Sequence, residues 1–269
     1  EEGVTRFSLL EDLRTAVTTE ELLVHYQPRL DLSSNRVLGV EALVRWRHPR
    51  RGLLTPGEFI ELAEVSGEID ALTRTVVARA TAELSQLPVA ADLELGINLS
   101  SRTLRHPALV EWIDSMLDRR RIQPGSICFE INEGQLMEDP ERAARAFAEM
   151  RALGVRLGVD DFGTGGSPVT LLGELPLDQV KLDPRLTAKV HHDATVVQSM
   201  IDLCHNLGLH VVAEGVEDRA TLEALRQLGC DSAQGFHIAA PMPVKDLVER
   251  LERPAGAGVS GGGPELQPH

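Results

Sequence analysis

Strand-like and helix-like segments alternate through most of this 269-residue chain. Runs rich in aliphatic residues predict strands at about 22–31, 36–46, 93–99, 126–131, 155–160, 178–182, 209–214 and 232–237. Apolar residues recur with helical spacing in 69–87, 107–121, 140–153, 193–207, 218–228 and 244–251. Such alternation is typical of parallel strands joined by crossover helices. Eight strands within about 250 residues favour a closed (β/α)8 barrel, a TIM-like α/β fold.

One connection in this pattern is too short for a crossover. Only Ser33, Ser34 and Asn35 separate the first two expected strands. A connection between parallel strands needs about a dozen residues or more. The first two strands must therefore form an N-terminal hairpin, which predicts a barrel with one antiparallel strand.

The chain is expected to contain a single barrel domain at 21–252. A lead-in helix and linker should precede it in 1–20, with amphipathic spacing at 6–17. Residues 253–269 are rich in Gly and Pro and cannot bury a core, so we expect a flexible tail there. The first residue is Glu rather than Met, and we interpret the chain as a fragment or a processed form.

The composition excludes several classes of function. Lys and Arg number 27 and Asp and Glu number 41, which gives a formal net charge of −14. A surface this acidic disfavours binding to nucleic-acid polymers and to anionic membranes. No apolar run reaches the length of a membrane span, so we expect a cytoplasmic domain without membrane contact. Three widely spaced cysteines without a CxxC pair argue against disulfides and against a thiolate zinc site.

Polar residues lie on or just after seven consecutive predicted strands. In a (β/α)8 barrel the ends of these strands meet at one rim, which is where the chemistry of this fold takes place. The residues are Glu41, Asn98, Glu130, Asp160, Asp161, Lys181, Glu214 and Gln234. Any one of them could be a helix cap or a solvated turn residue. Barrel closure, however, would bring all of them to the same mouth.

Five carboxylates at one mouth would repel one another without cations. Hard oxygen ligands favour Mg²⁺, Mn²⁺ or Ca²⁺, and the lack of histidine at these strand ends argues against zinc. The adjacent Asp160 and Asp161 would allow one ion to be shared and a second to be held beside it, which predicts a two-metal site. Lys181 among these acids would stay protonated. The pattern indicates metal-assisted hydrolysis of a phosphodiester.

The sequence EALVRW at 41–46 resembles the signature of EAL domains, a family of cyclic di-GMP phosphodiesterases. Further motifs follow in the family's order: YQP at 26–28, NLS at 98–100, DDFGTG at 160–165, KLD at 181–183, AEGVE at 213–217 and QGF at 234–236. The resemblance covers residues 5–252. It implies a barrel with one antiparallel strand, which the short hairpin connection predicts independently.

The resemblance also implies an activity and a set of residue roles. The activity is the hydrolysis of cyclic di-GMP to linear pGpG with Mg²⁺ or Mn²⁺, in bacterial second-messenger signalling. The implied metal ligands are Glu41, Asn98, Glu130 and Asp160 for the first ion, and Asp160 with Asp161 for the second. The implied catalytic group is Glu41, Asp161, Lys181 and Glu214, in which Lys181 and Glu214 position the nucleophilic water. The implied substrate contacts are Gln27, Leu43, Arg45 and Gln234. Supporting residues for ligands and loops would be Glu133, Asp183 and Glu217.

By the same resemblance, cyclic di-GMP is the expected partner. A homodimer is also expected, as is a place within a longer sensor protein, often one with a GGDEF domain.

Three features depart from the family pattern. Asn132 stands where the family usually has Thr, residues 165–169 read GGSPV instead of GYSSL, and the segment 181–214 is about three residues short. Every implied metal ligand is nevertheless present, so an active phosphodiesterase is the favoured interpretation. The alternative is a catalytically impaired domain that acts as a cyclic di-GMP receptor. A third interpretation is a barrel enzyme with another Mg²⁺-dependent reaction.

Overall fold

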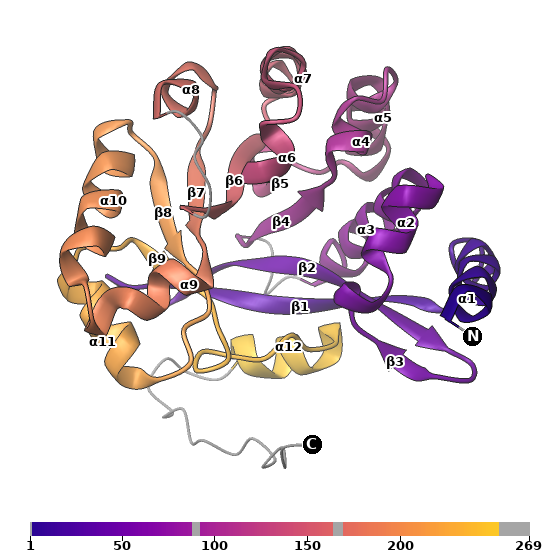
Figure 1. Ribbon diagram of the computed structural model, residues 1–269, viewed down its shortest axis with the longest axis horizontal. Coiled ribbons are helices and arrows are strands. Elements are labelled where there is room, and N and C mark those ends of the chain that lie inside the picture. Colours follow the sequence, from indigo (N-terminus) through magenta and orange to yellow (C-terminus); the bar gives the residue numbers. More distant parts are fainter. Residues whose placement is uncertain (1, 88–91, 164–168, 253–269) are drawn as a thin grey trace.

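The computed structural model describes residues 2–87, 92–163 and 169–252. Within these residues, eight strands close into a barrel and helices surround it (Figure 1). The strands are β1 (Leu22–Asp31), β2 (Val37–His48), β3 (Gly52–Leu54), β4 (Glu94–Leu99), β5 (Ile127–Asn132), β6 (Arg156–Phe162), β7 (Gln179–Leu182), β8 (His210–Ala213) and β9 (Ser232–Ala233). The helices are α1 (Glu2–Ala16), α2 (Ile60–Ser66), α3 (Ile69–Leu84), α4 (Ser101–Leu104), α5 (Leu109–Arg120), α6 (Glu133–Leu136), α7 (Pro140–Ala152), α8 (Val169–Glu174), α9 (Pro184–Thr187), α10 (Ala194–Asn206), α11 (Arg219–Gln227) and α12 (Val244–Glu252).

The barrel closes through β1, which among the described strands is the one that runs antiparallel to its neighbours in the ring. This strand pairs antiparallel with β2 on one side and with β9 on the other, whereas β2 and β4 to β9 pair parallel in the order β2-β4-β5-β6-β7-β8-β9. The hairpin predicted from the short connection is therefore confirmed. Its register sets Gln27 opposite Glu41. Strand β3 lies outside the ring and extends β2 as a second hairpin.

Strands such as β4 present an apolar outer face and carry polar groups on the face towards the barrel axis. In β4, Leu95, Ile97 and Leu99 are buried among the core residues that the surrounding helices cover. The alternate residues of β4, from Glu94 to Asn98, face the barrel axis because side chains alternate along a strand. A barrel interior is usually filled by bulky aliphatic side chains. Here polar groups occupy much of it, which already marks the interior as a site.

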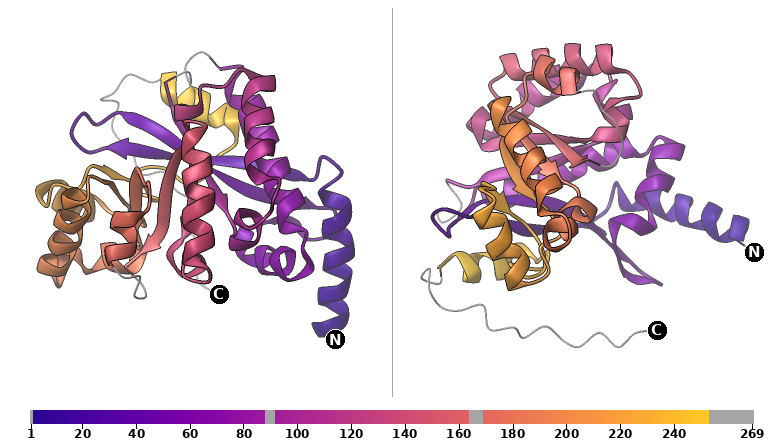
Figure 2. Two further views of the ribbon diagram at one scale, coloured as in Figure 1. Left: turned by 90° about the horizontal axis from the view of Figure 1, so that it is seen from above. Right: turned by 60° about the vertical axis from the view of Figure 1, so that its left-hand side comes forward.

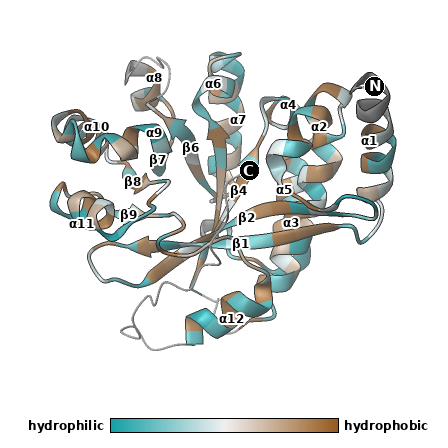
Figure 3. Ribbon diagram, turned by 60° about the horizontal axis from the view of Figure 1, so that its bottom comes forward, coloured by the Kyte–Doolittle hydropathy of each residue, from teal (hydrophilic) through white to brown (hydrophobic). Residues whose placement is uncertain are grey.

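Several helices begin at side-chain caps, among them α7, α10 and α11. Asp139 accepts a hydrogen bond from the Arg142 amide at the start of α7, and Asp193 caps α10 in the same way. Figure 3 shows hydrophilic and hydrophobic residues mixed along α12, whose Leu247 is fully buried. The helical apolar stripes thus turn towards the outer, apolar faces of the strands.

Helix α1 occupies the region of the lead-in helix expected at 6–17. It lies at the edge of the molecule, outside the ring of helices (Figure 2). Charged groups fix it in place: Asp12 contacts His48 at 3.2 Å and Arg50 at 2.7 Å, and Arg14 donates to Glu68 at 2.9 Å.

Some element boundaries differ from those expected. Strand β9 is two residues long, whereas 232–237 was expected, because the chain turns out of the sheet after Ala233. A Cβ atom on Gly235 would lie only 2.2 Å from the Val216 carbonyl oxygen, so this segment packs against the loop after β8. Strand β3 and helix α2 were not predicted, since each is too short to give a periodic signal. The expected tail at 253–269 and most of the altered loop at 165–169 lie outside the described residues.

No helix in the described parts of the chain combines the length and hydrophobicity needed to cross a membrane.

Candidate active site

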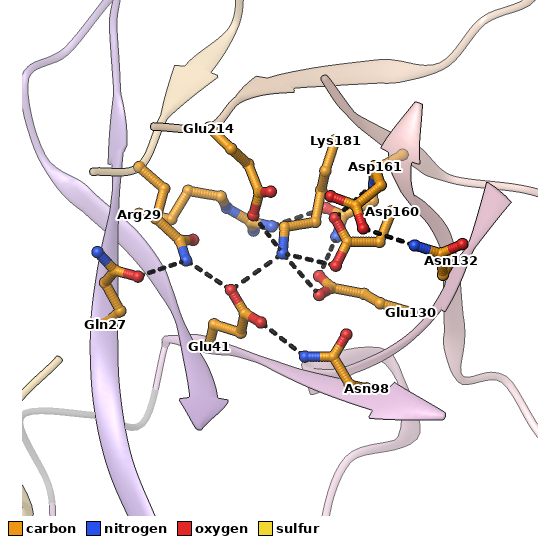
Figure 4. A network of polar contacts seen from close by, with 12 residues as sticks. Gln27, Arg29, Glu41, Asn98, Glu130, Asn132, Asp160, Asp161, Lys181 and Glu214 are labelled. Carbon is orange, nitrogen blue, oxygen red and sulfur yellow. Dashed lines mark hydrogen bonds and ion pairs between the residues drawn. The ribbon is translucent and has the colours of Figure 1, made fainter. Parts of the chain in front are cut away.

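The acidic residues expected at the rim come together inside the barrel mouth (Figure 4). Glu41 comes from β2, Glu130 from β5, Asp160 and Asp161 from β6, and Glu214 follows β8. Two groups of three can be drawn in which one carboxylate oxygen from each member lies within 4.8 Å of the others. The first group is Glu41, Glu130 and Asp160, and the second is Asp160, Asp161 and Glu214. Asp160 therefore belongs to both groups.

Lys181 on β7 lies in the middle of these acids and is 1% exposed. Its Nζ atom lies 2.6 Å from Glu214, 2.9 Å from Glu41, 3.1 Å from Glu130 and 3.5 Å from Asp160. A buried ammonium is tolerated only when it is paired in this way. With all groups ionised, five carboxylates and one ammonium carry a formal charge of −5 + 1 = −4, so the cluster keeps an excess of negative charge.

That excess appears in the pKa values of the cluster. Burial opposes the charged form of Lys181, but the surrounding carboxylates hold its pKa well above the ordinary value. Burial, with the charges of Glu41 and Asp160 adding to it, raises the pKa of Glu130 to about 7. Burial likewise raises the pKa of Glu214 well above its usual range. Glu41 behaves differently: although burial acts to raise its pKa, Lys181 and hydrogen bonds from Gln234 and Asn98 hold it below the usual range.

A backbone irregularity allows two adjacent aspartates to face the same site. Neighbouring residues in a regular strand point to opposite faces. Here the pairing of β6 with β7 shifts register between Val159 and Phe162, and Asp161 has a φ of 54°. Such a left-handed conformation is uncommon for a residue other than glycine and is typical of functional sites. The Asp161 amide donates to Asp160 Oδ1 at 2.8 Å, which fixes the pair.

Asn132, one of the departures from the family pattern, has two partners at this site. Its Oδ1 accepts a hydrogen bond from the Gly134 amide at 2.8 Å and so caps α6. Its Nδ2 donates to Asp161 Oδ2 at 2.5 Å. The amide thus supports Asp161, whose pKa is raised by burial and by the charge of Asp160.

The Glu130 side chain fits the requirements of a metal ligand. It is 2% exposed, and its Oε2 atom receives no hydrogen bond within the described structure. Lys181 lies 3.1 Å from that oxygen as an ion pair, without the alignment of a hydrogen bond. A buried, incompletely satisfied carboxylate oxygen among other carboxylates suits a hard divalent cation. The residues present can therefore hold a metal ion.

The residues expected to contact a ligand lie around this cluster. Asn98 donates to Glu41 Oε1 at 2.6 Å. Gln234 Nε2 contacts both Gln27 Oε1 at 3.1 Å and Glu41 Oε2 at 2.5 Å. Arg45 is half-buried and donates to the Val44 carbonyl. The structure thus brings Gln27, Gln234 and Asn98 to Glu41, and sets Arg45 on the same strand.

A pocket of about 270 Å³ opens beside the carboxylates. Its walls are mainly apolar and include Leu43, Ile60 and Leu72, and its polar end is formed by Asn98, Asp160 and Asp161. The pocket therefore joins an apolar chamber to the acidic cluster, so a ligand could place an apolar group in the chamber while a cation lies among the carboxylates.

The three expected supporting residues differ in their surroundings. Glu133 Oε2 accepts a hydrogen bond from the Gly163 amide at 3.0 Å, directly after the paired aspartates. Asp183 caps the short helix α9 and pairs with Arg185 at 3.0 Å. Glu217 is exposed in the loop after β8, and no hydrogen bond or ion pair joins it to the described residues.

Three interior residues were missed by the sequence interpretation: Arg29, Glu94 and Gln179. They form a buried layer beneath the acidic cluster, and Gln179 Nε2 donates to Glu130 Oε1 at 2.8 Å. The available signal was alternation. Gln179 lies two residues before Lys181 and Glu94 lies four before Asn98, so each pair shares a strand face.

Comparisons with known proteins agree with this fold. The family model of the EAL domain matches residues 10–241. The bifunctional diguanylate cyclase/cyclic di-GMP phosphodiesterase MucR of Pseudomonas aeruginosa is 36% identical over 248 residues, which are 90% of this chain and 36% of MucR. The cyclic di-GMP phosphodiesterase NbdA of the same organism is 37% identical over 246 residues, 90% of this chain and 31% of NbdA. The chain spans about a third of the length of these relatives.

Solved structures give the same result. A complex of the PaMucR phosphodiesterase with c-di-GMP matches with a TM-score of 0.85 and 37% identity, covering 89% of this chain and 99% of that one. The EAL domain of Mycobacterium smegmatis DcpA matches with a TM-score of 0.73 and 32% identity, covering 86% and 97%. Sequence motifs, barrel topology and these matches together show that the chain belongs to the EAL domain family.

Proposed function

We propose that this domain hydrolyses cyclic di-GMP to the linear dinucleotide pGpG with the help of two divalent cations, Mg²⁺ or Mn²⁺. The observation that carries the proposal is the position of Asp160, which belongs to two overlapping groups of three carboxylates. A carboxylate shared in this way is what two neighbouring cations need. Two divalent cations would also balance the formal charge of −4 in the cluster.

The residues divide between the two cation positions. Glu41, Asn98, Glu130 and Asp160 would hold the first cation, and Asp160 with Asp161 the second. Glu214 would join the second position as well, since its carboxylate lies in the same group as Asp160 and Asp161. When bound, the cations would activate water and neutralise charge on the scissile phosphate.

Lys181 and Glu214 would handle the reacting water. Their side chains lie 2.6 Å apart, and the surrounding carboxylates keep Lys181 protonated. Lys181 could then donate a hydrogen bond to a phosphate oxygen as negative charge builds on it. Glu214, in turn, could accept the proton that the water loses when it attacks phosphorus. The phosphorus–O3′ bond would break with its electron pair on O3′, which takes a proton from water to become the 3′ hydroxyl, while the phosphate stays on the 5′ oxygen of the other nucleotide and the ring opens.

The pocket beside the cluster would take one guanine base. Its apolar wall includes Leu43, and its polar residues Asn98, Asp160 and Asp161 are also expected to be metal ligands. A base in the chamber would leave its linked phosphate near Asp160. Gln27, Arg45 and Gln234 would contact the rest of the ligand from the β1 and β9 side of the mouth. The names of the relatives MucR and NbdA, both cyclic di-GMP phosphodiesterases, support this choice of substrate.

The test is an assay of cyclic di-GMP with the purified domain and Mn²⁺ or Mg²⁺, followed by ion-pair chromatography. We expect pGpG to appear, to vanish on chelation, and to be absent with Glu41→Ala. Binding of cyclic di-GMP without product would replace this proposal with the receptor function. Neither binding nor turnover would exclude both functions.

We also propose that the domain works as a homodimer within a longer cytoplasmic signalling protein. The greater length of its relatives, one of which is named a diguanylate cyclase as well as a phosphodiesterase, supports the longer protein. The homodimer rests on the family resemblance alone. Light scattering coupled to gel filtration would measure the mass of the domain. A monomer at all concentrations, with full activity, would contradict the homodimer.

A further inference from the structure

Beneath the acidic cluster, a chain of hydrogen bonds runs through the barrel interior to one metal-ligand carboxylate. Arg156 donates to Glu94 Oε2 at 2.7 Å, and Arg29 donates to Glu94 Oε1 at 2.6 Å. Arg29 also donates to Gln179 Oε1 at 2.7 Å. Gln179 Nε2 then donates to Glu130 Oε1 at 2.8 Å. Except for half-exposed Arg156, these side chains are nearly fully buried.

The direction of each hydrogen bond fixes the orientation of the Gln179 side-chain amide. Arg29 can only donate, so it holds the oxygen of Gln179 and leaves the nitrogen directed at Glu130. That nitrogen donates its hydrogen bond to Oε1 of Glu130. The other carboxylate oxygen, Oε2, carries no hydrogen bond in the described structure and lies near Lys181 and the remaining acids. Glu130 Oε1 is thereby held by Gln179, and Glu130 Oε2 remains available to the expected cation positions.

Glycines on the neighbouring strands make room for this arrangement. A Cβ atom on Gly96 of β4 would lie 2.9 Å from Glu130 Oε1, and one on Gly158 of β6 would lie 2.9 Å from Gln179 Cγ. A Cβ atom essentially never lies within 3.0 Å of another heavy atom outside its own chain neighbours, so one of the two groups would have to shift. Larger residues at these two positions would push the Glu130 and Gln179 side chains out of alignment. The glycines on β4 and β6 therefore provide the space that the Glu130 and Gln179 side chains occupy.

We propose that Gln179 is a positioning residue for the metal site, which orients Glu130 by a hydrogen bond that Arg29 and Glu94 hold in place. The inference rests on the proposed function in that it takes Glu130 as a ligand of the first cation. Groups that hydrogen-bond to metal ligands fix ligand orientation, and their loss typically weakens metal binding about 10–100-fold. Gln179 itself would touch neither cation nor substrate.

The test measures Mn²⁺ affinity directly, by titration calorimetry on the folded domain without substrate. Gln179→Met keeps the length of the side chain but cannot hydrogen-bond to Glu130. We expect its Kd for Mn²⁺ to rise about tenfold or more. Gln179→Asn, which keeps the amide but shortens it by one carbon, is expected to act in the same direction and serves if the methionine variant does not fold.

Arg156→Gln is the matched control, because it removes a contact from the far end of the chain and leaves Arg29 paired with Glu94. We expect its Kd for Mn²⁺ to stay within about twofold of the parent, whatever its melting temperature. An unchanged Kd in the Gln179 variants would overturn the inference. Equal weakening in Arg156→Gln would do so too, since the effect would then reflect a loosened barrel.

The same titration separates this inference from the proposed function. If the parent domain binds Mn²⁺ tightly and the Gln179 variants bind it weakly, the positioning role holds even when no cyclic di-GMP is hydrolysed. If the parent domain hydrolyses cyclic di-GMP and the Gln179 variants bind Mn²⁺ like the parent, the function holds and the positioning role fails. A parent domain that binds no Mn²⁺ overturns both.

Discussion

The barrel interior contains two polar layers with opposite electrostatic character. The lower layer joins Arg29, Glu94 and Gln179, in which one buried cation meets one buried anion at 2.6 Å. The upper layer places five carboxylates around the single ammonium of Lys181. In the lower layer Arg29 and Glu94 balance each other's charge, although Arg29 Nε has no hydrogen-bond partner among the described residues. In the upper layer the ionised acids outnumber the one ammonium and leave an excess of negative charge. Buried charge without compensation is costly, so it persists where a ligand supplies the missing charge.

The difference shows which polar residues of a barrel support the fold and which carry chemistry. Both layers are buried, charged and drawn from distant strands, so burial and composition do not separate them. What distinguishes the two layers is whether the charges within each one balance. Removing a charge from the upper layer should therefore affect activity and metal binding, whereas removing one from the lower layer should affect stability.

Removing the shared carboxylate should have the largest effect. Asp160→Asn keeps the size of the side chain but takes a charge from both groups of three, so we expect hydrolysis of cyclic di-GMP to fall roughly 10³-fold. The metal-free variant should be at least as stable as the parent, since it relieves repulsion. Chromatography of the products and urea unfolding would measure the two effects. A variant that loses stability while keeping its activity would contradict the division between the layers.

In the lower layer, the same kind of change should act on stability instead. Glu94→Gln leaves Arg29 buried without an ionised partner, which costs about 3 kcal/mol or more of unfolding free energy. In the double variant with Arg29→Met the loss should be smaller than the sum of the two single losses, because both charges are gone. Urea unfolding of the two single variants and the double variant would measure this coupling. Additive losses would show that the pair is not coupled.

Metal binding should stabilise the upper layer. Mn²⁺ at one hundred times its Kd should add about 2.7 kcal/mol to the unfolding free energy and raise Tm by several degrees. Differential scanning fluorimetry with and without chelator would measure the rise. Asp160→Asn should lose most of it and Arg156→Gln should keep it. No rise in the parent domain would argue against a metal site.

The stabilisation by Mn²⁺ should also depend on pH. Burial raises the pKa of Glu130 to about 7 from an ordinary value of 4.5. The folded, metal-free domain thus holds this proton more tightly than the unfolded chain. The stability contributed by protonated Glu130 is fully present below pH 4.5, the ordinary pKa, and is lost as the pH rises through about 7. Since Mn²⁺ replaces the proton, the rise in Tm should be larger one unit above that pKa than one unit below it, and a flat profile would contradict this.

The smallest effect should come from a change that touches neither layer. Asp139→Ala removes the side-chain cap of α7 and should cost about 1 kcal/mol of unfolding free energy. Hydrolysis and Mn²⁺ affinity should stay at the parent level, as checked by the same assays. A clear loss of hydrolysis or of Mn²⁺ affinity would mean that the outer helices also affect the site, so the two interior layers would not account for activity by themselves.

The two layers also differ in how far the sequence revealed them. The acids of the upper layer could be predicted because each lies on or just after an apolar strand, and barrel closure places such positions together. Arg29, Glu94 and Gln179 lie within strands, where a polar residue can face either solvent or the barrel axis. For Glu94 and Gln179, alternation from Asn98 and Lys181 indicates the face towards the axis. The hydrogen bonds that join them to Arg29 depend on strands far apart in the sequence. The bulge that turns Asp160 and Asp161 into one site also escapes pattern reading, because it depends on the pairing of β6 with β7.

By itself, the sequence determined the α/β barrel, the antiparallel hairpin and the identity of the acidic groups that meet at its mouth. These follow from local periodicity, connection length and the order of the motifs, which neighbours in the chain specify. Tertiary structure alone decided which interior charges are compensated. It tied one oxygen of Glu130 to Gln179 and left the other, beside Lys181, without a hydrogen bond from the described residues. It also set Glu214 beside Asp160 and shortened β9 against Val216. Those outcomes depend on contacts between residues that are far apart in the sequence. A difference of a few ångströms between two such side chains decides whether a charge is paired.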